Sequence, residues 1–94
     1  MQYGQILATR GVADDMEEDP RFRAELAQAF AKYQGGDWGV VCREVWQQND
    51  ESLISGDRIL AAYETSHGRI WIITEAEDDN GRRSATTFLY PSEY

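Results

Sequence analysis

The residue types best suited to chemistry in this chain gather around its only histidine. His67 has Glu64 and Arg69 close to it in the sequence. Imidazole titrates near neutral pH and guanidinium binds phosphate, so this trio would suit general acid–base chemistry on a phosphodiester. A catalytic base needs a cleft, however, and a histidine beside Gly68 is typical of a turn. We therefore interpret His67 as a solvated loop residue.

Two dense groups of carboxylates raise the question of a metal site, because Mg²⁺ and Ca²⁺ prefer oxygen ligands. The run DDNGRRSA lacks the alternating ligands and the distal Glu of an EF-hand loop, and its two arginines would oppose a cation. There is also no Gly-rich phosphate loop, no dinucleotide fingerprint and no GxSxG elbow. The sequence therefore predicts no metal, no cofactor and no hydrolase triad.

The same carboxylates have two other interpretations, a solvated surface or a negative face that docks on a basic surface of another protein. A basic surface of that kind usually binds nucleic acid, so the chain would compete with DNA or RNA for it. Trp38 lies between Asp37 and Gly39 and either plugs the end of the core or protrudes toward the partner. The predicted contact residues are Asp14, Asp15, Glu17, Glu18 and Asp19 (acidic segment 14–19), Asp37, Trp38, and Glu75, Glu77, Asp78 and Asp79 (acidic loop 75–79).

Composition limits the class of protein. Ninety-four residues that are 41% hydrophobic predict one folded domain, 1–94, and the formal net charge of -8 disfavours direct nucleic-acid binding. Cys42 is the only cysteine, so we expect no intrachain disulfide, a core-packing role for Cys42 and a cytoplasmic protein. No apolar run approaches the length needed to span a membrane.

Helical signals occupy the first half of the chain. After a short strand around Ile6, Val12 and Met16 are spaced for a single helical turn. Asp19-Pro20 predicts the start of a helix over about 20–33, because Asp accepts from the free amides of the first turn and Pro needs no partner there. Its apolar stripe is Phe22, Leu26, Phe30 and Tyr33.

A second helix is expected over 41–54, followed by Gly56. Three β-rich runs then follow, 58–64, 69–75 and 85–90, and they predict an antiparallel meander. The expected order is β-α-α-β-β-β, an α+β domain with two helices packed on a small antiparallel sheet. Trp46 and Trp71 are predicted to lie in its core.

Several short motifs resemble those of a family of small bacterial proteins common on plasmids, integrative elements and prophages. They are GDWG at 36–39, RILAAY at 58–63, IWIITEA at 70–76, SATT at 84–87 and PSEY at 91–94. In that family the Glu-Ala pair is followed closely by Asp-Arg-Ser-Ala-Thr-Thr, so EAEDDNGRRSATT carries an insertion. The resemblance implies mobile-element cargo, a class that includes anti-CRISPR and anti-restriction inhibitors, and it implies no catalytic residues.

The interpretation from the sequence is a non-enzymatic acidic binding protein that inhibits a host defence complex by blocking its basic nucleic-acid-binding surface. The alternative comes from the element order, which resembles that of RelE- and ParE-type toxins and would make the chain a small RNase that uses its sheet and His67. Such toxins are usually basic, as RNA contact requires. For an enzyme, Glu64, His67, Glu75 and Arg83 are the candidate residues. The oligomeric state stays open.

Overall fold

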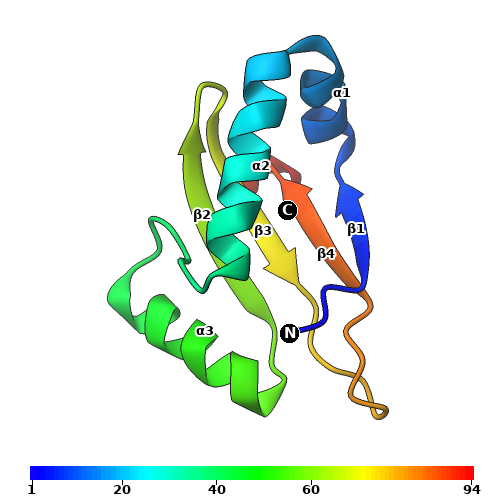
Figure 1. Cartoon of the computed structure of the whole chain (residues 1–94), viewed down its shortest axis with the longest axis vertical. Helices are drawn as coiled ribbons and strands as arrows, with labels where there is room; N and C mark the ends of the chain where they lie inside the picture. The colour runs from blue at the N-terminus through cyan, green and yellow to red at the C-terminus, as the bar shows by residue number, and fades with distance from the viewer.

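A computed structural model describes all of residues 1–94 and shows a four-stranded sheet with three helices (Figure 1). This confirms the predicted α+β class, with helices packed on a small, mostly antiparallel sheet. The elements are β1 Gln5–Ala8, α1 Arg10–Glu18, α2 Pro20–Gln34, α3 Arg43–Ser55, β2 Ile59–Thr65, β3 Gly68–Thr74, β4 Ala85–Leu89 and a final 3-10 turn η1 Pro91–Glu93.

The strands lie in the order β1-β4-β3-β2. The predicted meander of β2, β3 and β4 is antiparallel, whereas β1 pairs in parallel with β4 and forms one edge of the sheet. Ile72 is paired with Phe88 and Ala61 at the centre, and all three side chains lie on the face that α2 covers. The apolar run in β3 is therefore the middle of the sheet, as its composition predicts.

Helix α2 carries most of the core contact. Asp19 caps its first turn, with Oδ1 accepting from the amides of Arg21 at 3.0 Å and Phe22 at 3.3 Å. Of the predicted stripe, Phe22, Leu26 and Tyr33 are buried and Phe30 is half-buried. Burying one such large apolar side chain stabilises the fold by about 1.5–3 kcal/mol, so this stripe anchors α2 to the sheet.

Helix α1 is longer than the single turn expected from Val12 and Met16. Val12 is buried as predicted, but the acidic run continues the helix to Glu18. The far end of the chain stabilises the start of α1, because Glu93 accepts from the Thr9 hydroxyl at 2.6 Å and from the Gly11 amide at 2.9 Å. That carboxylate complements the positive end of the helix dipole. The observed order is therefore β-α-α-α-β-β-β, with one helix more than expected.

Helix α3 closes the β2 edge of the sheet. Its buried residues are polar: Asn49 donates to the Leu60 carbonyl at 2.8 Å and accepts from the Leu60 amide at 3.3 Å. Two residues along, Ala62 pairs with the segment before α3 through Val40 and Trp38. Because α3 begins at Arg43, Cys42 lies just before it and is exposed, so the prediction of a core role for Cys42 is wrong.

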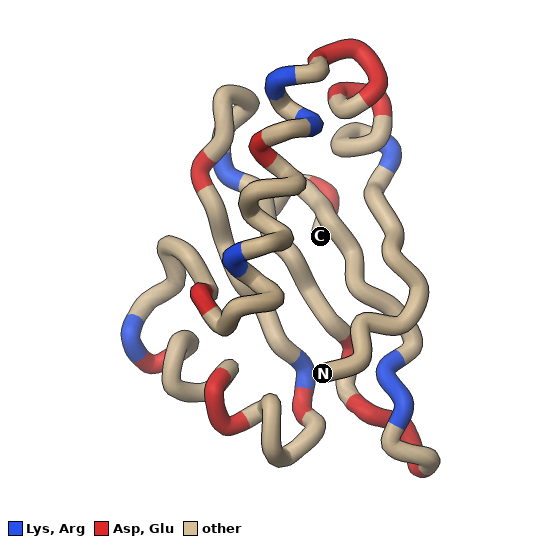
Figure 2. The backbone as a smooth tube through the Cα atoms, viewed as in Figure 1, with Lys and Arg blue, Asp and Glu red and all other residues tan.

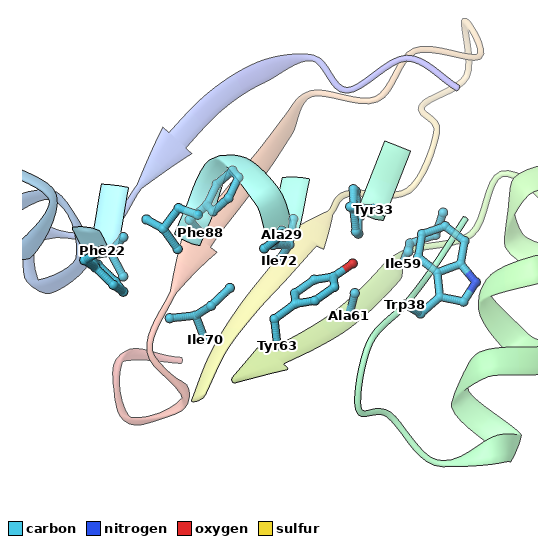
Figure 3. Close-up of a cluster of buried hydrophobic side chains, with 12 residues drawn as sticks. Phe22, Ala29, Tyr33, Trp38, Ile59, Ala61, Tyr63, Ile70, Ile72 and Phe88 are labelled. Atoms are coloured by element: carbon cyan, nitrogen blue, oxygen red, sulfur yellow. The ribbon is translucent and has the colours of Figure 1, made fainter. Parts of the chain in front are cut away.

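The core fills the space between α2 and the sheet, and Trp38 lies at its α3 end (Figure 3). The predictions for the other two tryptophans were too strong, because Trp46 and Trp71 are only half-buried. Trp46 packs against the edge of the core. Trp71 faces the side of the sheet away from α2, where the ring of Tyr94 meets it edge-on at 5.7 Å between centroids.

Candidate binding surfaces

His67 lies at the tip of the β2–β3 hairpin, as predicted, but the tip folds against the helices. Its Nε2 is 2.7 Å from Asp19 Oδ2 and its Nδ1 is 3.4 Å from Asp15 Oδ2. The imidazole ring also lies against the ring of Phe22, with 4.3 Å between centroids. The interpretation of His67 as a freely solvated residue is therefore wrong, and this contact joins acidic segment 14–19 to the hairpin.

The hydrogen bond to Asp19 raises the pKa of His67 above its ordinary value, and the Asp15 carboxylate adds to this effect. Reciprocally, the same hydrogen bond lowers the pKa of the Asp19 carboxyl. Tyr90 completes the group by donating to Asp15 Oδ2 at 2.5 Å, and partial burial raises the pKa of its phenol. The arrangement favours a protonated imidazole between two carboxylates, with both ring nitrogens engaged.

The four side chains that would serve an enzyme do not converge. Glu64 pairs with Arg69 at 2.6 Å beside the hairpin tip, while Glu75 pairs with Arg58 at the opposite end of β3. An open depression of about 540 Å³ does lie beside His67, lined also by Asp15, Arg69, Tyr90, Pro91 and Ser92. Since both nitrogens of His67 already contact carboxylates, the ring has no free nitrogen aimed into that depression.

Acidic segment 14–19 divides into residues that support the fold and residues that face solvent. Asp19 caps α2 and holds His67, while Asp15 holds His67 and Tyr90. Asp14 forms a long, exposed pair with Arg10 at 3.9 Å. Glu17 and Glu18 are exposed and take part in no ion pair of the molecule. Only these last two have the free carboxylates expected of a contact surface.

Acidic loop 75–79 is exposed over most of its length but anchored at its base. Arg83 is 4% exposed, and its guanidinium donates to the carbonyl oxygens of Glu75, Asp57 and Ser52 at 2.9–3.0 Å. The Glu77 amide donates to the Gly56 carbonyl at 2.8 Å. Arg83 therefore tethers the loop to the end of α3 and is unavailable as a catalytic residue.

The side chains within this loop also differ in their freedom. Asp78 accepts from the amides of Asn80 and Arg82 through the same Oδ1, so it shapes the turn. Glu77 and Asp79 are exposed, and neither takes part in an ion pair of the molecule. They are the free carboxylates of acidic loop 75–79.

The two acidic groups lie at opposite ends of the molecule rather than on one negative face (Figure 2). The register explains this separation, because Gln5 pairs with Ala85 next to the loop whereas Ala8 pairs with Phe88 next to α1. The expectation of a single face is corrected to two acidic ends on a molecule 38 Å long. The end of α3 adds Asp50, Glu51 and Asp57 near acidic loop 75–79, which sequence spacing alone did not associate with it.

Asp37 and Trp38 have internal roles. Trp38 is 0% exposed and its Nε1 donates to Asp50 at 2.9 Å, so it plugs the end of the core and is not a contact residue. Asp37 accepts from the Gly39 amide at 3.0 Å, and its carbonyl accepts from the Tyr63 hydroxyl at 2.6 Å. These bonds shape the GDWG turn against β2.

No group of three or more His, Cys, Asp or Glu side chains is arranged to hold a metal ion. None of the helices has the length and apolar character to cross a bilayer. Comparison of the chain with protein families, with curated proteins and with solved structures finds no match.

Proposed function

We propose that this chain is a non-enzymatic acidic binding protein that occupies a basic, nucleic-acid-binding surface of a partner protein. The observation that carries the proposal is the pair of acidic ends with free carboxylates: Glu17 and Glu18 at one end, Glu77 and Asp79 at the other. Charges that the fold does not neutralise project a field that steers a cationic partner and complements its surface.

The family resemblance adds the biological setting. Small acidic proteins of plasmids, prophages and integrative elements include inhibitors of host defence, so the partner we propose is a CRISPR or restriction complex in the cytoplasm. Two acidic ends on a molecule 38 Å long would imitate successive phosphate groups along a nucleic-acid backbone. The inhibitor would then act by occupancy, and it would need no cofactor or metal.

Capture from host lysate tests this proposal, with two double variants that remove the free carboxylates and leave the structural ones intact. They are Glu17→Lys with Glu18→Lys, and Glu77→Lys with Asp79→Lys. The matched control is Glu44→Lys with Glu51→Lys, which changes the net charge equally on exposed positions of α3. We expect the natural chain and the control to capture a nucleic-acid-binding protein and at least one test variant to lose it.

Equal capture by all four proteins, or no capture by any, would contradict the proposal. The toxin-like alternative is tested on the same samples by incubating the purified protein with ribosome-bound and free RNA. RNA cleavage that is lost on His67→Gln would replace the binding function with an enzymatic one.

A further inference from the structure

The two edges of the sheet are treated differently by the rest of the chain. On the β2 edge, Asn49 bonds both backbone groups of Leu60, and the segment before α3 bonds those of Ala62. On the β1 edge nothing follows: β1 pairs only with β4, and Figure 1 shows it as the last strand of the sheet. An unpaired edge strand is a template for the addition of another strand.

The backbone groups available on β1 follow from its hydrogen bonding. The amides of Gln5 and Thr9 donate inward, to Ser84 and Phe88 of the β4 side. Successive residues of a strand point their backbone groups to alternate sides, so those of Ile6 and Ala8 face outward. Two residues of β1 therefore each offer one donor and one acceptor to an incoming strand.

An apolar groove runs beside this edge, between β1 and α2. It has a volume of about 360 Å³, and its walls come from Ile6 and Ala8 of β1, Met16 of α1, and Leu26, Ala27 and Phe30 of α2. The single charged residue in the lining, Arg23, donates to the Met16 carbonyl at 3.0–3.1 Å and is already engaged. Ile6 is 52% exposed and Leu7 40% exposed, which is unusual for strand residues of this size.

Charge identifies the occupant. β1 begins beside the loop that carries Glu77 and Asp79 and ends at α1, which carries Glu17 and Glu18. A strand added along β1 therefore has an apolar groove at its middle and free carboxylates near both ends. Antiparallel pairing with a second copy would instead bring the α1 end of one chain to the loop end of the other, with acid facing acid.

We propose that β1 and the β1–α2 groove bind an extended segment of the partner protein, with β-branched or apolar residues at its centre and Lys or Arg at both ends. The segment adds a strand to the sheet through Ile6 and Ala8 and seats alternate side chains in the groove. This inference rests on the proposed function, since it names the part of the basic partner that makes contact.

A synthetic peptide tests the edge without any cellular partner. Its centre is Thr-Val-Thr-Ile-Thr with Lys-Arg on each side, and the control peptide has proline in place of the central threonine. Titrated into isotopically labelled protein, the first peptide is expected to shift the amide resonances of Ile6 and Ala8 and to protect them from solvent exchange. Because proline cannot continue a ladder, the control peptide is expected to bind about tenfold more weakly.

Matched variants separate the groove from general charge. Ile6→Lys places a cation at the groove and is expected to abolish the response, whereas Ile54→Lys makes the same change at a 92% exposed position of α3 and is expected to retain it. Shifts confined to acidic residues, with Ile6 and Ala8 unchanged, would overturn the inference. So would a concentration-dependent dimer that Ile6→Lys dissociates, since the occupant would then be a second copy.

The cellular capture experiment distinguishes this inference from the function on which it rests. Loss of the partner on Ile6→Lys but not on Ile54→Lys would support the edge as the contact. If Ile6→Lys captures the partner as well as the natural chain does, while the acidic-end variants lose it, the edge inference fails and the proposed function stands.

Discussion

Nε2 of His67 lies 2.7 Å from Oδ2 of Asp19, across 48 positions of sequence. This contact joins the tip of the β2–β3 hairpin to the residue that caps α2. Beside it, Ser66 donates to the Glu25 carboxylate through both its amide and its hydroxyl. The hairpin tip is thus held to the helices by carboxylates alone, and one of these contacts depends on the protonation of an imidazole.

The first prediction is that stability depends on pH through His67. Its pKa in the folded chain is raised above the ordinary 6.5, so the contact contributes fully below pH 6.5 and is lost as pH rises through the raised pKa. The pKa of Asp19 is lowered from 3.8, so its contribution is present above pH 3.8 and is lost as pH falls through the lowered value.

Urea unfolding from about pH 5 to about pH 9 measures this effect in the natural chain and in His67→Gln. The charged groups facing the ring are Asp15 of α1, Asp19 at the start of α2 and Arg69 of β3, with the Tyr90 hydroxyl beside them. The natural chain should lose more stability than the variant as the pH is raised. Parallel curves for the two proteins would rule out a protonated His67 as a stabilising contact.

The second prediction concerns Arg83, whose buried guanidinium serves three carbonyl oxygens and no carboxylate. Arg83→Met leaves those acceptors without a partner and should lower the free energy of unfolding by about 3 kcal/mol or more. The neighbouring Arg82 is exposed, and Arg82→Met should change it by less than about 0.5 kcal/mol. Chemical denaturation of both variants checks this, and equal effects at the two positions would contradict the tether.

The third prediction concerns Trp38, which sequence reasoning left open between core and partner contact. Because its side chain is fully buried and bonded to Asp50, Trp38→Ala should destabilise the fold by about 3–5 kcal/mol. Ile54, which is 92% exposed, provides the control, and Ile54→Ala should leave the melting temperature nearly unchanged. A Trp38→Ala variant with natural stability and impaired partner binding would instead make Trp38 a contact residue.

Local signals explain why much of the fold was predictable. The stripe of α2, its start at Asp19 and Pro20, and the positive φ of 83° at Gly56 and 93° at Gly68 are each encoded within a few neighbouring residues. The separate strands likewise follow from β-rich runs. The parallel pairing of β1 with β4 was not predictable this way, because it joins residues 80 positions apart, such as Gln5 and Ala85.

The candidate site depended more on such distant contacts. Nothing near Asp15 or Asp19 in the sequence shows that both carboxylates meet His67, so their structural roles were missed. Arg83 has the composition of a surface residue and is buried only because three carbonyls converge on it. The acidic character itself was predictable, whereas its division between two ends required the register of β1 on β4.

The most direct test of the acidic-end proposal is displacement of nucleic acid from the captured partner. Labelled DNA or RNA is bound to that partner, and fluorescence anisotropy is followed as this protein is added. The natural chain and Glu44→Lys/Glu51→Lys should displace the nucleic acid equally, and Glu77→Lys/Asp79→Lys should displace it at least about tenfold less effectively. Displacement by all three proteins alike, or a stable complex that still holds its nucleic acid, would contradict the account.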